Sequence, residues 1–331
     1  MSTVNTKKDL LVGQIKQVLL LYDLGVLKNC FQLSFGYANQ NYRIDTDQGS
    51  FLYRVCTQQP LPLIEYEVAL MKALQQIDFP TAYPIAKKDG GFIHSLGEHY
   101  VMVYEFYNGH EPALNVHTSS AIAEAIGKLS LLPNAPRYLK KNAIHLDTCD
   151  ALIAEFERAK NPIPVLLEYF KEQTNYLRPL LRQPLPEGVV HGDCFTDNTL
   201  FDGNQLVAVI DFEEACYDHL LFDVGVTING FCFPDNQLDS VLLEAFLTAY
   251  QRQRLLTHEE WTLLFAYIQW GAHGMITWHL QNNLLHKHHH SQWQRVQELM
   301  HRVQQMRQEE TQINQLITQI AKRLKNATNR E

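Results

Sequence analysis

The order of strand-like and helix-like segments is the feature of this sequence that most constrains its fold. Alternating apolar residues and turn residues over 31–56, with a turn at 47–50, predict a strand–turn–strand unit. Residues 63–77 have helical period, and residues 80–106 are again strand-like. From about residue 116 the chain is mainly helical. Early strands followed by late helices predict an α+β fold with segregated lobes.

The length of the chain agrees with two lobes. It has 331 residues, of which 46% are hydrophobic, which is enough for a large core and too much for one simple layer. We place the first lobe at residues 1–106 and the second at 107–331. Within the second lobe, the apolar period predicts one long C-terminal helix over about 291–326.

A β-rich island at 188–212 interrupts the helical pattern and carries the polar residues with the most chemical information. After a short apolar strand it contains His191, Asp193 and Asn198, and a second apolar strand ends in Asp211. Phosphoryl transfer needs a carboxylate that orients the attacking hydroxyl, and oxygen ligands for the Mg²⁺ that bridges the phosphates. Protein kinases have the same Asp-to-Asn spacing followed by a metal-binding Asp-Phe. The island therefore predicts a kinase that depends on ATP and Mg²⁺.

The same region resembles the superfamily of aminoglycoside phosphotransferases and choline kinases, and within it the bacterial homoserine kinases of that fold. The resemblance runs from about residue 20 to about residue 285 and is densest in HGDCFTDN at 191–198 and IDFEEACYDHLLFD at 210–223. It implies a two-lobed, protein-kinase-like fold. The N-terminal antiparallel-sheet lobe would bind ATP, and the mainly helical lobe would bind a small molecule with a hydroxyl group.

The resemblance also implies a role for each residue of the motif. Asp193 is expected to be the catalytic base, with His191 bracing its loop. Asn198 and Asp211 are expected to hold Mg²⁺. Asp223, at the start of the next helix, would either cap that helix or hydrogen-bond the loop.

Three acidic residues after the metal aspartate are candidates for binding the acceptor: Glu213, Glu214 and Asp218. Homoserine carries an ammonium and a carboxylate close to its hydroxyl, so its site needs both an acidic side chain for the ammonium and a basic side chain for the carboxylate. In a strand-like segment Glu213 and Glu214 would point to opposite sides, so only one is expected to contact the ammonium. The sequence does not identify the basic side chain that would bind the carboxylate.

In the first lobe, the resemblance implies a grip on the nucleotide. Gly36, Asn39 and Asn41 match the family's turn over the phosphates. Arg54 stands where protein kinases have a phosphate-contacting lysine, and a guanidinium can bind phosphate through two hydrogen bonds.

The expected partner of Arg54 is a helix glutamate, for which Glu65 and Glu67 compete. Glu67 shares a helix face with apolar residues, and a carboxylate buried there needs a cation, which favours Glu67. The hinge whose backbone would bind adenine is expected at Tyr104, Glu105 and Phe106.

Composition limits the partners and the compartment. A formal net charge of −8 argues against a nucleic-acid-binding protein. No segment approaches the roughly 18 apolar residues of a membrane span, so we expect no membrane partner. The six cysteines include no CxxC pair, which argues against a disulfide framework or a zinc site and favours the cytoplasm.

Two further features leave alternatives open. The histidine cluster at His286, His288, His289 and His290 lies in a polar stretch, and a solvated loop is favoured over a metal site. Near the C-terminus, apolar residues alternate at spacings of four and three. A helix packed on its own lobe is favoured there, and a coiled-coil homodimer is the alternative.

The leading functional hypothesis is a homoserine kinase, which converts L-homoserine and ATP to O-phospho-L-homoserine in threonine biosynthesis. The first alternative is another small-molecule kinase of this fold, acting on an aminoglycoside, choline or another alcohol. The second is a catalytically silent nucleotide-binding protein, although Asp193, Asn198 and Asp211 are all intact.

Overall fold

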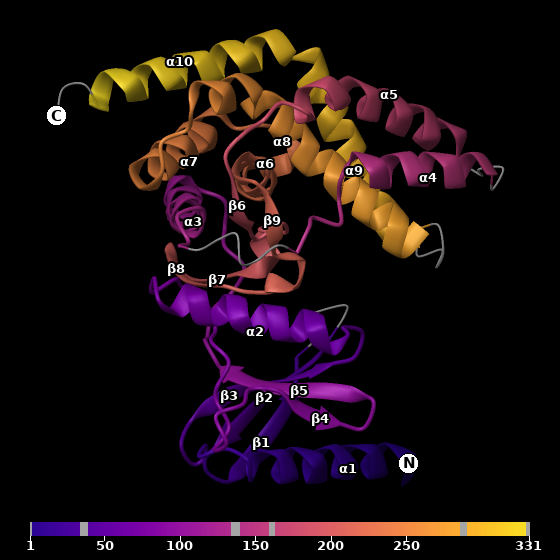
Figure 1. The fold of residues 1–331 in the computed structure, drawn as a ribbon, viewed down its shortest axis with the longest axis vertical. Coiled ribbons are helices and arrows are strands. Elements are labelled where there is room, and N and C mark those ends of the chain that lie inside the picture. The colour runs from indigo at the N-terminus through magenta and orange to yellow at the C-terminus, as the bar shows by residue number, and fades with distance from the viewer. Residues whose placement is uncertain (1, 34–38, 134–139, 159–162, 285–289, 329–331) are drawn as a thin grey trace. The chain divides into compact units, whose positions relative to one another are not determined.

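The computed structural model describes residues 2–33, 39–133, 140–158, 163–284 and 290–328 (Figure 1). The chain divides into two compact units, Met1–Gly109 and His110–Glu331. They are named here the N-terminal unit and the C-terminal unit.

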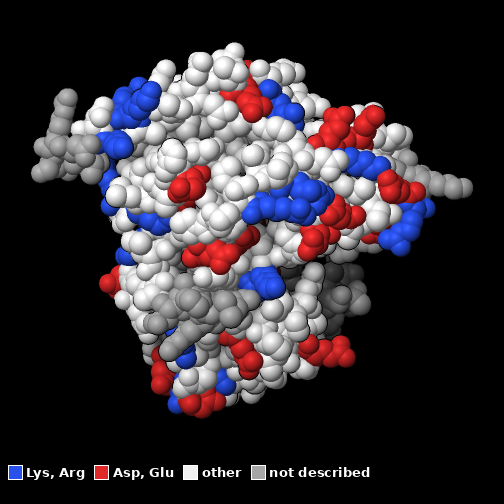
Figure 2. Space-filling view, turned by 45° about the horizontal axis from the view of Figure 1, so that its top comes forward, with Lys and Arg blue, Asp and Glu red and all other residues white. Residues whose placement is uncertain are grey.

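Charged side chains are intermixed on the surface. On the face shown in Figure 2, acidic and basic groups lie beside one another among large uncharged areas. Among the helices that the structure describes, none is both long enough and apolar enough to cross a membrane. Each of the six cysteines, all within the described ranges, is a free thiol.

The N-terminal unit is a five-stranded sheet with one helix on each face (Figure 1). Its strands are ordered β1-β2-β3-β5-β4, and every neighbouring pair is antiparallel. The elements are α1 (Ser2–Leu19), β1 (Leu27–Gln32), β2 (Asn39–Thr46), β3 (Ser50–Cys56), α2 (Leu61–Gln75), β4 (His94–Leu96) and β5 (His99–Glu105).

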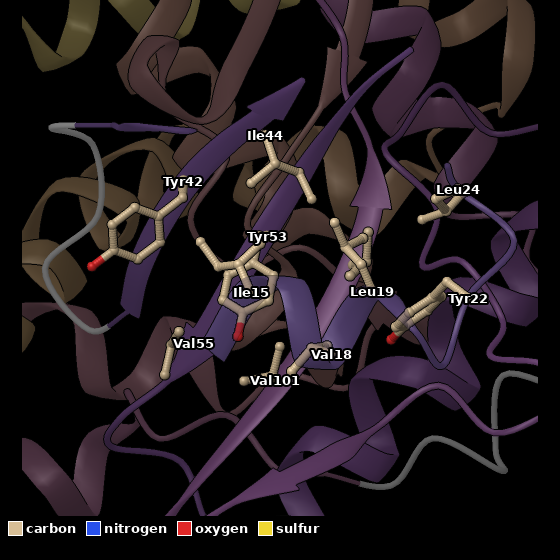
Figure 3. Close-up of a cluster of buried hydrophobic side chains, with 11 residues drawn as sticks. Ile15, Val18, Leu19, Tyr22, Leu24, Tyr42, Ile44, Tyr53, Val55 and Val101 are labelled. Carbon is tan, nitrogen blue, oxygen red and sulfur yellow. The ribbon is translucent and has the colours of Figure 1, made fainter. Parts of the chain in front are cut away.

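Alternation along β3 decides which residues reach each helix. Tyr53 and Val55 belong to the core that α1 covers, together with Ile15 and Val18 (Figure 3). Successive strand residues point to opposite faces, so Arg54 faces the α2 side of the sheet. Because Tyr53 and Val55 pack against α1, Arg54 between them lies on the face of the sheet that α2 covers.

The segment between α2 and β4 is less regular than the sequence predicted. We expected strands across residues 80–106, but before β4 the ladder contains only an isolated bridge from Pro84 to Tyr104 among the described residues. Proline cannot donate a ladder hydrogen bond. A turn follows, in which Gly90 has φ +83° and its N–H donates to the carbonyl of Lys87.

The C-terminal unit is mainly helical, with two small antiparallel sheets, β6–β9 and β7–β8. Its first elements are α3 (Val116–Leu129), α4 (Leu146–Arg158), α5 (Pro164–Leu181), β6 (Glu187–Val190), β7 (Thr199–Asp202), β8 (Gln205–Val209) and β9 (Cys216–His219). They are followed by α6 (Leu220–Phe231), α7 (Ser240–Gln253), α8 (His258–His279), a π-helical turn (Leu280–Leu284), α9 (His290–Gln308) and α10 (Glu310–Thr328).

Helices α6 and α8 approach so closely that their backbones touch. A Cβ atom on Gly225 would lie 2.1 Å from the carbonyl oxygen of Tyr267, and one on Gly271 would lie 2.8 Å from the backbone of Gly225. No larger residue fits at either position without separating the helices. This contact fixes α8 against the segment that enters α6.

The C-terminal segment forms two helices, where the sequence predicted one over about 291–326. α9 and α10 are separated at Glu309, and both sides of the break are tied to Tyr176 in α5. The guanidinium of Arg307 lies 3.7 Å from the centre of the Tyr176 ring, and the Tyr176 hydroxyl donates to Glu310 at 3.0 Å. The bend lets α10 turn onto α7 and α8 (Figure 1).

Among the apolar residues at the alternating spacings, Leu324 is half-buried and the others are buried within the chain. The buried ones are Leu299, Val303, Met306, Ile313, Ile317 and Ile320. Packing on its own lobe, the interpretation favoured from sequence, is therefore confirmed. The coiled-coil homodimer, the alternative interpretation, stays a prediction.

Candidate active site

The three polar residues of the predicted kinase motif come together through a hairpin. Asp193 lies in the loop that follows β6, Asn198 ends a 3₁₀ turn just before β7, and Asp211 follows β8. The N–H of Ile210 donates to the carbonyl of Asn198 at 2.9 Å. The β7–β8 hairpin therefore brings Asp211 back beside the loop.

Asn198 fixes the carboxylate of Asp193. Its side-chain nitrogen donates both to the carbonyl oxygen of Asp193 and to Oδ2, each at 2.8 Å. Because the nitrogen is used in this way, the amide oxygen of Asn198 is the end that can bind a cation. Burial raises the pKa of Asp193 well above its usual value, and the charges of Asp197 and Asp211 add to the increase. Such a carboxylate is suited to accept a proton.

Asp211 has the features of a cation ligand. Its backbone is left-handed, with φ +65°, a conformation that costs a non-glycine residue about 1 kcal/mol or more and that clusters at functional sites. Its Oδ1 is buried and has no hydrogen-bond partner among the described residues. An isolated buried carboxylate oxygen is costly, and a bound cation would compensate for it.

The oxygen ligands offered by Asp211 and Asn198 suit a Mg²⁺ ion that takes its remaining ligands from outside the protein. Asp211 and the amide oxygen of Asn198 are hard oxygen ligands. Within the described ranges, no three His, Cys, Asp or Glu side chains surround a common metal position. A cation here would need ligands from outside the protein, and Mg²⁺ commonly takes them from phosphates and water.

His191 braces the loop through both ring nitrogens. Nδ1 accepts the N–H of Asp193 at 3.3 Å, so Nε2 carries the proton and donates to the carbonyl of Ile210 at 2.9 Å. Burial lowers the pKa of His191, which favours this neutral form. The ring also packs against Phe212, with centroids 4.5 Å apart. The bracing that we expected of His191 is present.

The carboxylate of Asp223 holds the loop and does not cap its helix. It accepts the N–H of His191 at 2.7 Å and that of Gly192 at 2.8 Å. Burial raises the pKa of Asp223 to about 6, against the lowering effect of the two donors. Gly192 has φ +82°, and a Cβ there would lie 3.1 Å from the carbonyl oxygen of Glu214, so the turn requires glycine.

Glu214 lies close enough to Asp193 for its charge to act on that carboxylate. Its charge is among those that raise the pKa of Asp193. Its Oε1 accepts a hydrogen bond of 3.2 Å from the indole nitrogen of Trp278, at the end of α8. The sequence did not identify Trp278, which stands 64 residues away in no recognised motif. An indole nitrogen near the end of an apolar helix was the only available signal.

A second element beside the site is the segment of residues 140–142. Its Lys140 carbonyl accepts the N–H of Tyr217 at 2.7 Å, and Lys141 bridges to Tyr217 in parallel register. Asn142 donates to the carboxylate of Asp218 at 2.7 Å. The ammonium of Lys140 donates to the carbonyl of Glu213. The segment is thus fastened to β9 and to the turn after Asp211.

Asp218 is engaged on both oxygens. Besides the bond from Asn142 to Oδ2, its Oδ1 accepts the N–H of His219 at 2.7 Å. Burial raises its pKa, and these donors oppose the increase. Asp218 therefore holds neighbouring parts of the chain in place.

In the N-terminal unit, Arg54 pairs with Glu67. The guanidinium lies 3.1 Å from Oε1 of Glu67, and both side chains are buried. Tyr104 completes the group: its hydroxyl donates to the same carboxylate oxygen at 3.2 Å, and its ring lies 5.1 Å from the guanidinium carbon of Arg54. The other candidate partner, Glu65, is exposed. The choice of Glu67 from its helix face is confirmed.

The other expected nucleotide residues occupy neighbouring positions. Asn39 and Asn41 lie in β2, where Asn41 stands directly opposite Arg54. Residues opposite each other in an antiparallel pair share a face of the sheet. At the expected hinge, the N–H of Glu105 donates to the carbonyl of Tyr83 at 3.0 Å, and the ring of Phe106 lies 5.0 Å from the guanidinium carbon of Arg43.

Two sequence features fall where the structure gives no description. Gly36 lies outside the described residues. So do His286, His288 and His289, while His290 begins α9. The expectations for these residues stay predictions.

Comparison with known proteins agrees with this geometry. The sequence model of the phosphotransferase enzyme family matches residues 31–264, a span that contains the Arg54–Glu67 pair and the loop around Asp193. The chain is 28% identical over 256 residues to the homoserine kinase of Nitrobacter winogradskyi, an alignment covering 76% of this chain and 78% of that enzyme.

Solved structures agree on the fold. An amicoumacin kinase in complex with AMP-PNP and Ca²⁺ has a TM-score of 0.68 at 15% identity, covering 88% of this chain and 92% of that one. A microcompartment-associated aminopropanol kinase has a TM-score of 0.62 at 16% identity, covering 92% and 98%. The expected α+β, protein-kinase-like fold is therefore confirmed.

Proposed function

Since this chain belongs to the phosphotransferase enzyme family, we propose that it is a homoserine kinase, which transfers the γ-phosphoryl group of ATP to the hydroxyl of L-homoserine. One observation carries the proposal. A partly buried carboxylate, Asp193, is held by Asn198 beside Asp211, whose buried oxygen has no protein donor within the described ranges. The sequence relationship to a curated homoserine kinase supports the choice of acceptor.

Asp193 is the proposed base. Its raised pKa favours uptake of the acceptor's hydroxyl proton as the oxygen attacks phosphorus. His191 and Asp223 keep the loop in place, and Asn198 directs Oδ2 of Asp193. Asn198 and Asp211 would hold Mg²⁺, which when bound neutralises the charge of the transferring phosphoryl group.

In the N-terminal unit, Arg54 is proposed to bind phosphate oxygens of ATP. The buried bond to Glu67 keeps its guanidinium in a fixed orientation, which reduces the entropy lost on binding. Gly36, Asn39 and Asn41 are proposed to lie along the phosphates. The backbone of Tyr104–Phe106 is proposed to bind adenine.

Glu214 is proposed to bind the ammonium of the acceptor. Its charge acts on Asp193, and the indole nitrogen of Trp278 donates a hydrogen bond of 3.2 Å to its carboxylate. Glu213 is not assigned this role, and we propose that Asp218 positions the segment of residues 140–142 through Asn142. A second candidate acceptor is an amino alcohol without a carboxylate, since the Glu214–Trp278 pair alone would suit a simple cation.

An acceptor panel tests the proposal. Purified protein with ATP and Mg²⁺ is assayed by coupled ADP release on L-homoserine, choline, ethanolamine and several aminoglycosides. We expect kcat/KM of about 10⁴ M⁻¹s⁻¹ or more on L-homoserine and far lower values on the others. Efficient turnover of another alcohol, with none on homoserine, would overturn the acceptor and leave the kinase activity. No turnover on any acceptor would favour a silent nucleotide-binding protein.

A further inference from the structure

A lysine ammonium from a distant segment of the chain contacts the backbone of the acidic turn after Asp211. The ammonium of Lys140 donates to the carbonyl of Glu213, the residue next to Glu214. Lys140 is partly buried, and an ammonium has three donors, so one carbonyl does not exhaust it. A lysine in this position is a charged group beside the proposed ammonium site.

The position of Lys140 is fixed by backbone contacts. Its carbonyl accepts the N–H of Tyr217 at 2.7 Å, and the Asn142–Asp218 bond of 2.7 Å anchors the same segment on its other side. β9, which contains Tyr217 and Asp218, is itself paired with β6. The segment is therefore tied to the strand that leads into the 191–198 loop, and its charge is held in place before any ligand binds.

The chemistry of the acceptor requires such a neighbour. In homoserine the ammonium and the carboxylate are attached to the same carbon, so the protein groups that bind them must lie close together. The ammonium of Lys140 contacts the backbone of the residue that precedes Glu214, and this position meets that requirement. A second cation near the loop, Arg295, lies 5.8 Å from the ring centre of Phe195 and 3.5 Å from Glu298, so it approaches from α9.

We propose that Lys140 binds the carboxylate of the acceptor while Glu214 binds its ammonium. The proposal rests on the proposed homoserine kinase activity and adds the residue that selects an amino acid over an amino alcohol. Asp218 and Asn142 act as positioning residues for Lys140. The Arg295 contact with Phe195 makes it the alternative partner in the test.

Two analogues of homoserine separate the charges. Propanolamine lacks the carboxylate, and γ-hydroxybutyrate lacks the ammonium. The variants are Lys140→Gln, Lys140→Arg and Glu214→Gln, with exposed Lys141→Gln as the matched control. The measured quantity is kcat/KM on each of the three acceptors, and thermal denaturation of each variant reports on folding.

Lys140→Gln should lower kcat/KM about 10- to 100-fold on L-homoserine and on γ-hydroxybutyrate, because a charged hydrogen bond is lost. It should leave kcat/KM on propanolamine unchanged. Glu214→Gln should show the reciprocal pattern, with losses on L-homoserine and propanolamine. Lys140→Arg should recover part of the activity on L-homoserine, and Lys141→Gln should resemble the wild type on all three acceptors.

Equal losses on all three acceptors, or a charge-selective loss in Arg295→Gln in place of Lys140→Gln, would overturn the assignment. These results would leave the homoserine kinase proposal intact, provided that the wild-type protein phosphorylates L-homoserine. If Lys140→Gln does not fold, Lys140→Arg decides: a shift in preference toward propanolamine supports the assignment, and an unchanged preference contradicts it. Failure of the wild-type protein on L-homoserine would instead reject the proposed function.

Discussion

The side-chain nitrogen of Asn198 lies 2.8 Å from the carboxylate of Asp193, so one residue both directs the proposed base and offers its oxygen to a cation. Asn198→Asp separates these roles, because it keeps an oxygen ligand and replaces the donor by a second carboxylate. Like charges at this distance should raise the pKa of Asp193 further. We expect kcat near pH 7 to fall by about 100-fold or more, with partial recovery at higher pH.

The control for this prediction is Asn198→Ala, which loses the donor and the oxygen together. It should be inactive at every pH, and its Mg²⁺-dependent nucleotide binding should be weaker than that of Asn198→Asp. The pH–rate profile and calorimetry with an ATP analogue measure the two effects. A pH-independent defect in Asn198→Asp would contradict the role of the donor.

Asp193→Asn should abolish phosphotransfer and leave nucleotide binding near the wild-type value, because Asp193 acts on the acceptor hydroxyl. Asp211→Asn should weaken nucleotide binding, and only when Mg²⁺ is present. Single-turnover assays measure the transfer, and calorimetry with and without Mg²⁺ measures binding. Near-normal turnover by Asp193→Asn would show that another group is the base.

The parts of the site that the sequence predicted are local in the chain. Asp193, Asn198 and Asp211 stand within one hairpin, so their spacing alone brings them together. Glu67 was chosen over Glu65 because a helix face is a local property as well. In each case the neighbouring residues determine the geometry.

The parts that the sequence missed depend on tertiary packing. Trp278 reaches Glu214 across 64 residues, and Lys140 reaches Glu213 across 73. β9 was also missed, because its four residues include no apolar run and it forms as the partner of β6. The break at Glu309 has the same origin, since it follows from the surfaces on which α9 and α10 pack.

Ile320 in α10 is fully buried, and Ile320→Ala should destabilise the protein by about 2–5 kcal/mol through lost contacts and a cavity. Exposed Lys322→Ala on the same helix should change stability by less than about 0.5 kcal/mol. Urea unfolding measures both variants. A negligible change in Ile320→Ala would contradict the burial of α10. An intersubunit role for this residue predicts that the Ile320→Ala effect depends on protein concentration.

Buried His273 makes the stability of the C-terminal unit depend on pH. Burial lowers its pKa to about 3, and its Nε2 lies 2.9 Å from the hydroxyl of Thr174. In the unfolded chain His273 is protonated as the pH falls below about 6.5, whereas in the folded chain it is protonated only near pH 3. This contribution to stability is therefore fully present above pH 6.5 and is lost as the pH falls toward the folded value, by up to about 1.4 kcal/mol per pH unit.

His273→Gln removes that titration, so its stability should fall less steeply than that of the wild type as the pH drops from about 7 to about 5. His279, whose pKa burial lowers to about 4, still titrates in the variant, so a smaller pH dependence should remain. The control is exposed His301→Gln, which should keep the wild-type slope. Urea unfolding at several pH values gives the free energy of unfolding for each protein. The test compares the slope of the unfolding free energy against pH, so a general destabilisation by glutamine does not affect it. Equal slopes in His273→Gln and the wild type would show that His273 titrates freely in the folded state.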